Sequence, residues 1–148
     1  MSYQERRALA SLVGTVLISA IYLVVVLPRY PQGNPYSVDV FHFWGSSILI
    51  LIPVSIAANI AIHIQFNIIT NMATSKKEDR LSDERDKLIQ LRAVRNSTYV
   101  FVSGFFLAMG SLVIDMPPSA MFMILVSSGI VSGLVGAISE LYFYRRGF

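Results

Sequence analysis

Long apolar stretches alternate with short polar ones along the chain, and four of the apolar stretches are long enough to cross a bilayer. A hydrocarbon core of about 30 Å requires about 20 mostly apolar residues in a helix. The predicted spans cover approximately residues 8–27, 40–67, 93–114 and 119–142. The pattern therefore predicts an all-α polytopic membrane protein, with four transmembrane helices in one bundle and a single membrane domain over residues 1–148.

One strongly hydrophilic segment, residues 75–95, separates the second predicted span from the third. From Asp83 onward, the acidic residues come first and Arg92 and Arg95 come last, while leucines recur along the segment at helical spacing. Asp83 precedes Lys87 by four residues, and an acid placed before a base in this way weakly stabilises a helix. The segment is therefore predicted to form an amphipathic helix that is either continuous with the third span or hinged onto it.

The composition agrees with a membrane protein. Hydrophobic residues make up 54% of the chain and charged residues 14%, whereas about a quarter of an average globular protein is charged. These values exclude a soluble enzyme domain and a disordered tail. The chain also has no cysteine, which excludes thiolate catalysis, cysteine-bound metals and disulfides.

The basic residues lie on one side of the predicted membrane. The chain has 12 lysines and arginines, and all of them except Arg29 lie near the two termini or within residues 75–95. By the positive-inside rule, both termini and this segment are predicted to be cytoplasmic. Because the positive charge flanks the spans, we expect it to contact anionic lipid of the bilayer, and we predict no direct nucleic acid binding.

Polar residues recur every fourth position in the cytoplasmic half of the second span. They are Ser55, Asn59, His63 and Asn67. This spacing places them on one face of a helix, and because polar groups are costly in lipid, the stripe should face the bundle interior or another subunit. Pro53 lies just before the stripe and favours a kink. The stripe either lines a water-filled vestibule or forms hydrogen bonds between helices.

Glu140 is the only acidic residue within the fourth predicted span. A carboxylate near hydrocarbon needs a partner, and His63, Arg92 and Arg95 are predicted to lie at a similar depth. We therefore expect a Glu140–Arg95 or Glu140–His63 pair. Such a pair is either a static ion pair or, through the histidine, a proton-sensitive latch.

Small residues on the fourth span predict close helix packing. They are Gly129, Ser132, Gly133 and Gly136. Gly129 and Gly133 form a G-x-x-x-G motif. Such motifs allow two backbones to approach closely inside a membrane. The third span offers Gly104 and Ala108 at the same spacing. The stripe packs either within the bundle or as the seam of a homo-oligomer.

No metal, cofactor or catalytic site is predicted. The two histidines, His42 and His63, are separated by about 31 Å of helix at 1.5 Å per residue, so they cannot share a metal within one chain. The chain contains no G-x-S-x-G elbow, Walker motif or H-E-x-x-H motif. We therefore predict a protein that is not an enzyme.

The acidic cluster of Asp83, Glu84 and Asp86 has three interpretations. Its charges either pair with one another on a solvated helix face, bind a divalent ion or recognise a protein. The segment lacks the glycine-containing loop of an EF-hand, and its charges alternate in sign. Protein recognition is the functional interpretation that we favour, on a docking surface made of Asp83, Glu84, Arg85, Asp86, Leu88 and Leu91.

The same segment carries a resemblance to a family. The run Asp83-Glu84-Arg85-Asp86-Lys87-Leu88-Ile89, followed by Arg92 and Arg95-Asn96-Ser97, resembles a family of small bacterial four-helix integral membrane proteins. That family has a D-E-R-D-x-x-I-type motif before its third helix and no established activity. The local match covers about Ser82 to Gly110. The resemblance implies four spans in a bacterial or archaeal cytoplasmic membrane and, from neighbouring genes for small helix-turn-helix regulators, a regulatory partner.

Two functions of different classes follow from these features. The first is a non-enzymatic sensor or scaffold that couples the membrane to a cytoplasmic partner, for which a transcription regulator is one candidate. The alternative is a subunit of an oligomeric channel or small-solute transporter that uses the polar stripe of the second span. The chain lacks the two matching halves that inverted-repeat transporters show, which favours the first function.

Overall fold

The computed structural model describes residues 3–31, 33–73 and 80–146, and within them the side chains of residues 3, 59, 62–63, 65–73 and 80–83 are not described. The model is 91% helix, and no strand occurs in the described ranges. In chain order the elements are α1 (Tyr3–Val26), the 3-10 helix η1 (Leu27–Arg29), α2 (Val38–Ala73), α3 (Arg80–Val113) and α4 (Pro118–Arg146).

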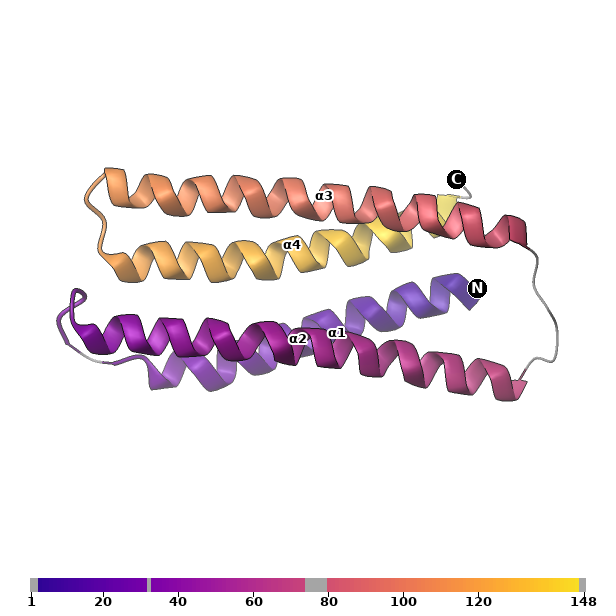
Figure 1. Cartoon of the computed structure of the whole chain (residues 1–148), viewed down its shortest axis with the longest axis horizontal. Helices are drawn as coiled ribbons and strands as arrows, with labels where there is room; N and C mark the ends of the chain where they lie inside the picture. The colour runs from indigo at the N-terminus through magenta and orange to yellow at the C-terminus, as the bar shows by residue number, and fades with distance from the viewer. Residues whose placement is uncertain (1–2, 32, 74–79, 147–148) are drawn as a thin grey trace.

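The helices form a bundle with two distinct ends (Figure 1). α1 begins and α4 ends at one end, which we call the terminal end. The connections from α1 to α2 and from α3 to α4 lie at the other end, which we call the turn end. α3 and α4 lie side by side and antiparallel, while α1 runs diagonally from this pair at the terminal end toward α2 at the turn end.

The predicted all-α fold is confirmed, with four helices that are long and apolar enough to cross a membrane. Four segments are long and apolar enough to span a bilayer: Gln4–Arg29, Val38–Ala58, Glu84–Val113 and Pro118–Arg146. α1 has 24 residues and α4 has 29, which gives rises of about 36 and 43 Å at 1.5 Å per residue. Both exceed the roughly 30 Å of a hydrocarbon core.

α2 and α3 are longer than the spans predicted for them. α2 has 36 residues and continues through Pro53, as helices in membranes commonly do when neighbouring groups satisfy the freed carbonyl. α3 has 34 residues and runs without interruption from the hydrophilic segment into the apolar one. No glycine or proline occurs between Arg80 and Ser103, so nothing in the sequence separates the amphipathic helix from the third span.

The turn between α3 and α4 is short and closed by backbone hydrogen bonds. Asp115 adopts a left-handed conformation with φ 57°. Its N–H donates to the carbonyl of Leu112 at 3.3 Å, and the N–H of Met116 donates to the carbonyl of Ser111 at 3.0 Å. This is the hydrogen-bond pattern of a Schellman motif. Pro118 then begins α4, so the chain reverses direction within a few residues and brings the two helices together.

The buried positions of the bundle hold mostly small residues. Among them are Ala8, Ala93, Ala108 and Ala137, together with four serines. Many large apolar side chains, such as Leu49 at 75% exposure, point outward instead. This inversion of the pattern of a soluble protein is what a lipid environment requires, because there close packing rather than burial of apolar area holds helices together.

Candidate functional site

α3 and α4 pack closely because small residues face each other between them, and we call this contact the α3–α4 seam. A methyl group placed on Gly104 would overlap the Cβ atom of Ser128. A methyl group placed on Gly136 would lie 3.3 Å from the Cβ atom of Ser97. Such close approach supplies the van der Waals contact that associates helices in lipid.

Side-chain hydrogen bonds cross the same seam. Ser132 Oγ donates to the carbonyl oxygen of Ser97 at 2.9 Å. Because a hydroxyl has one hydrogen, the 2.8 Å contact between the two hydroxyls is then donated by Ser97 Oγ to Ser132 Oγ. Nearer the terminal end, Asn96 Nδ2 donates to Ser139 Oγ at 3.2 Å. Hydrogen bonds as well as close packing therefore hold α3 and α4 together.

The small residues predicted on the fourth span point in different directions. Ser132 and Gly136 face α3, and a Cβ atom at Gly133 would lie 3.4 Å from Thr15 Cγ2 of α1. A Cβ atom at Gly129 would have no heavy atom within 4 Å among the described residues. Part of the stripe thus packs within the chain, and a homo-oligomer seam stays a prediction.

At the terminal end, polar side chains join α1 to α3 and α4. The Arg7 guanidinium attracts the half-buried Glu140 carboxylate, and Gln4 Nε2 donates to Asp86 Oδ2 at 3.0 Å. The hydroxyl of Tyr144 hydrogen-bonds the same Asp86 carboxylate. We call these five residues the terminal polar cluster. A cavity of about 260 Å³ lies beside it and is lined by both Arg7 and Glu140.

Sequence reasoning did not find Arg7, although its depth near the start of α1 matches that of Glu140 near the end of α4. Arg92 and Arg95, which the sequence suggested as partners of Glu140, lie at exposed positions on α3. The side chain of His63 lies outside the part that the structure describes. The Glu140–Arg95 and Glu140–His63 pairs therefore stay predictions.

Most of the polar stripe predicted on α2 also lies outside the described side chains. Ser55 is half-buried, whereas nothing is described of the side chains of Asn59, His63 and Asn67. α2 makes no contact with α3 within the described residues. The channel or transporter alternative, which depends on this stripe, stays a prediction.

The segment of α3 predicted to dock a partner has a buried face and an exposed one. Ile89, at 2% exposure, and Ala93 pack into the bundle, while Leu88 is 57% and Leu91 66% exposed. Glu84 and Arg85 are exposed as well, and Asp86 belongs to the terminal polar cluster. The side chain of Asp83 is not described. We call the four exposed residues, Glu84, Arg85, Leu88 and Leu91, the α3 edge.

At the turn end, aromatic rings join α2 to α4 and to the chain that follows α1. The Trp44 ring stacks on the Phe122 ring with centroids 6.1 Å apart, and Tyr30 lies near both Phe43 and Trp44. Val40 and Val126 are buried in the same cluster. These contacts hold the start of α2 against the bundle.

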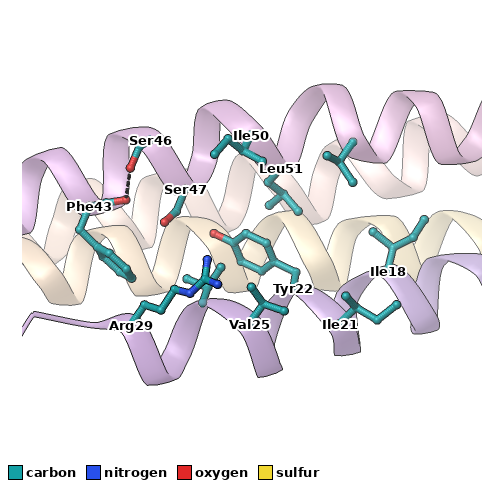
Figure 2. Close-up of a pocket in the computed structure, with 12 residues that line it drawn as sticks. Ile18, Ile21, Tyr22, Val25, Arg29, Phe43, Ser46, Ser47, Ile50 and Leu51 are labelled. Atoms are coloured by element: carbon teal, nitrogen blue, oxygen red, sulfur yellow. Dashed lines mark hydrogen bonds between the residues drawn. The ribbon is translucent and has the colours of Figure 1, made fainter.

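A cavity of about 370 Å³ lies between α1 and α2 next to this aromatic cluster, and Figure 2 shows the side chains around it. Its walls are mostly aliphatic, with Tyr22, Arg29, Ser46 and Ser47 as the residues that carry polar side chains. The buried Tyr22 hydroxyl has no hydrogen-bond partner in the described part of the chain. Sequence reasoning missed this cavity, because it depends on how α1 and α2 cross.

The described residues contain no group of three or more His, Asp or Glu side chains placed to hold a metal ion. Comparison with known proteins adds no assignment: no protein-family model, no curated protein and no solved structure matches the chain. The candidate regions are therefore the terminal end with the α3 edge, and the cavity between α1 and α2.

Proposed function

We propose that the protein is a non-enzymatic sensor or scaffold that couples the membrane to a cytoplasmic partner protein, which binds the α3 edge. The observation that carries this proposal is the exposure of two leucines, Leu88 and Leu91, on a helix whose opposite face is buried. Exposed leucines are ordinary where they face lipid. They need another explanation where they lie beyond the hydrocarbon.

The length of α3 supports a position of the α3 edge at or beyond the limit of the hydrocarbon. From Val113 back to Leu91 and Leu88, the helix rises about 33 and 37 Å at 1.5 Å per residue, compared with a hydrocarbon core of about 30 Å. The charged residues lie at this end of α3, so this end protrudes. Leu88 and Leu91 are three residues apart and therefore lie on one face of α3, and apolar side chains grouped in contact with water favour an interaction site.

The distribution of basic residues supports a cytoplasmic location for the terminal end. Lysine and arginine occur at both termini and between α2 and α3, whereas Arg29 is the one such residue at the turn end. The positive-inside rule then orients the protein with both termini in the cytoplasm, and the family resemblance favours a bacterial or archaeal cell. The partner proposed here is a soluble regulatory protein, with a transcription regulator as the candidate that the family resemblance favours.

The terminal polar cluster connects the α3 edge to α1 and α4, so that movements of these helices in the membrane reach the surface that binds the partner. Asp86 lies on the helical turn that carries the α3 edge, and it is held by Gln4 of α1 and Tyr144 of α4. A change in the tilt of α1 or α4 would pull on these contacts and reposition Leu88. The partner would then bind a surface whose geometry depends on the state of the bundle.

Site-specific photo-crosslinking tests the proposal in membranes of the native host. A benzophenone amino acid at Leu88 is expected to give a protein adduct that disappears when Leu91→Glu is introduced. The matched control carries the benzophenone at Leu107, which is 68% exposed on the same helix but inside the span, and it should give no such adduct. Absence of a Leu91-dependent adduct, or equal adducts from both positions, would contradict the proposal.

A further inference from the structure

The cavity between α1 and α2 has the form of a site for an elongated apolar molecule. Its volume of about 370 Å³ lies in the range of roughly 300–1,000 Å³ typical of small-molecule sites. Aliphatic side chains from both helices make up most of its wall: Ile18, Ile21, Val25, Ile50, Leu51 and Val54. A chain of methylene groups is the ligand that such a wall accepts.

Polar groups gather in one part of this cavity. Figure 2 shows the Tyr22 hydroxyl, the Ser47 hydroxyl and the Arg29 guanidinium turned toward one another, with Ile18 and Ile21 farther along α1. The Tyr22 hydroxyl is buried and has no hydrogen-bond partner within the described residues. A buried donor without a partner is costly, so a ligand that accepts from it gains affinity.

The charge of Arg29 selects the kind of polar group that fits there. Arg29 is the one lysine or arginine at the turn end of the chain, and its side chain lines the cavity. A guanidinium binds a carboxylate through two parallel hydrogen bonds. An anionic oxygen acceptor facing Arg29 and the Tyr22 hydroxyl would satisfy both groups together.

The length of the cavity matches one leaflet of the bilayer. From Ile18 to Arg29 the chain rises about 16 Å at 1.5 Å per residue, which is close to half of a hydrocarbon core of about 30 Å. Arg29 therefore lies near the membrane surface while Ile18 lies near the middle. An amphiphile aligned with the lipids would place its head and its chain at these two levels.

We propose that this cavity binds a long-chain fatty acid, with its alkyl chain between α1 and α2 and its carboxylate on Arg29 and the Tyr22 hydroxyl. The small volume favours one alkyl chain over the two chains of a phospholipid. The site lies at the opposite end of the bundle from the α3 edge. Its test is therefore independent of whether a partner binds that edge.

Binding of tritiated oleate to the full-length protein in a nonionic detergent, measured by scintillation proximity, tests the proposal. We expect saturable binding that unlabelled oleate displaces, while oleyl alcohol, which lacks the charge, and phosphatidylglycerol do not. Equal displacement by oleyl alcohol would contradict the role of the carboxylate. Displacement by phosphatidylglycerol at concentrations similar to oleate would contradict a fatty acid as the ligand.

Substitutions at the polar end identify the site. Arg29→Gln is expected to weaken oleate binding about 10- to 100-fold, because it removes a charge-assisted hydrogen bond to the carboxylate. The control Arg6→Gln changes an exposed arginine at the far end of α1 and should leave binding unchanged. Tyr22→Phe removes only a hydroxyl that has no hydrogen-bond partner among the described residues, so the protein should fold normally and bind oleate several-fold more weakly.

A substitution at the apolar end completes the test. Leu51→Trp fills the cavity and should abolish saturable binding, whereas Leu49→Trp, at a position 75% exposed on the same helix, should preserve it. If Leu51→Trp fails to fold, Tyr22→Phe and Arg29→Gln still decide the outcome. Unchanged oleate binding in both of these variants would overturn the proposal.

Discussion

The two helix pairs of the bundle are packed on different principles. In the α3–α4 pair, small residues bring the backbones together at Gly104 and Gly136, and serine hydroxyls bond across the seam. In the α1–α2 pair, large aliphatic side chains surround a cavity of about 370 Å³. One half of the bundle is therefore closely packed, while the other half leaves a cavity between its helices.

The connections between the elements follow the same division. α3 and α4 are joined by a tight Schellman turn, whereas α1 and α2 are joined by η1 and the longer stretch from Tyr30 to Ser37. α1 contacts both α2 and α4, and α2 also contacts α4 through the aromatic cluster at the turn end. Substitutions on the two sides of the bundle should therefore have unequal effects on stability.

The largest effect is expected at the closest point of the seam. Gly104→Val would force its side chain into Ser128, and overpacking of this kind costs about 1–3 kcal/mol or more. The free energy of unfolding in mixed detergent micelles, followed by circular dichroism, measures the loss. Gly129→Ala, at a position with open space around its Cβ, is the matched control and should not destabilise the protein. Equal stability of the two variants would show that the seam is not tightly packed.

A smaller loss of stability is expected at the terminal end, where α1 joins α3 and α4. Arg7→Gln removes the charge that attracts the half-buried Glu140 carboxylate and should lower the free energy of unfolding by about 1–2 kcal/mol, somewhat more than the roughly 0.2–1 kcal/mol of a fully exposed ion pair. In the double variant with Glu140→Gln, the second substitution should restore part of this loss. If the two losses simply add in a double-mutant cycle, the residues do not interact.

The hydroxyl groups across the seam should contribute less than its shape. Ser132→Ala removes the hydrogen bonds to Ser97 and should cost about 0.6 kcal/mol, the mean for side-chain hydrogen bonds between membrane helices, and no more than about 1.7 kcal/mol. Ser103→Ala is the control, because Ser103 Oγ donates within α3 to the carbonyl of Tyr99. Equal losses of stability in the two variants would show that the hydrogen bonds across the α3–α4 seam stabilise the protein no more than a hydrogen bond within one helix.

The smallest effect is expected in the α1–α2 pair. Leu51→Ala enlarges a cavity that already exists, so the side chain gives up few contacts and the loss should stay below about 1 kcal/mol, well short of the 2–5 kcal/mol typical of a packed leucine. The same unfolding assay, without added fatty acid, measures it. A loss of several kcal/mol would show that α1 and α2 are packed as tightly as α3 and α4.

The sequence predicted the helices well and their lateral arrangement poorly, for a physical reason. Hydropathy depends on the position of a residue along the chain, so it located four spans and the basic terminal end. The approach of Arg7 to Glu140 depends on which helices are neighbours and how they are rotated, which hydropathy does not encode. Small residues such as Gly104 and Gly136 indicated that close contacts exist, although the sequence did not indicate that Ser128 and Ser97 complete them.

The cavity and the extent of α3 show the same limit. An aliphatic residue such as Leu51 has the same hydropathy whether it faces lipid, a helix or a cavity. The sequence also left open whether the hydrophilic segment is hinged onto the third span or continuous with it. The continuity of α3 is what gives the exposed Leu88 and Leu91 their distance from the turn end.

The account depends most on the claim that the two ends of the bundle face opposite sides of a membrane, with the α3 edge in the cytoplasm. The chain has no native cysteine, so single cysteines at Glu84 and Asn34, both exposed, can be labelled with a membrane-impermeant maleimide on intact cells. We predict that Asn34→Cys reacts on intact cells and that Glu84→Cys reacts only after the cells are lysed. Labelling of Glu84→Cys on intact cells, or equal labelling of both positions, would contradict the account.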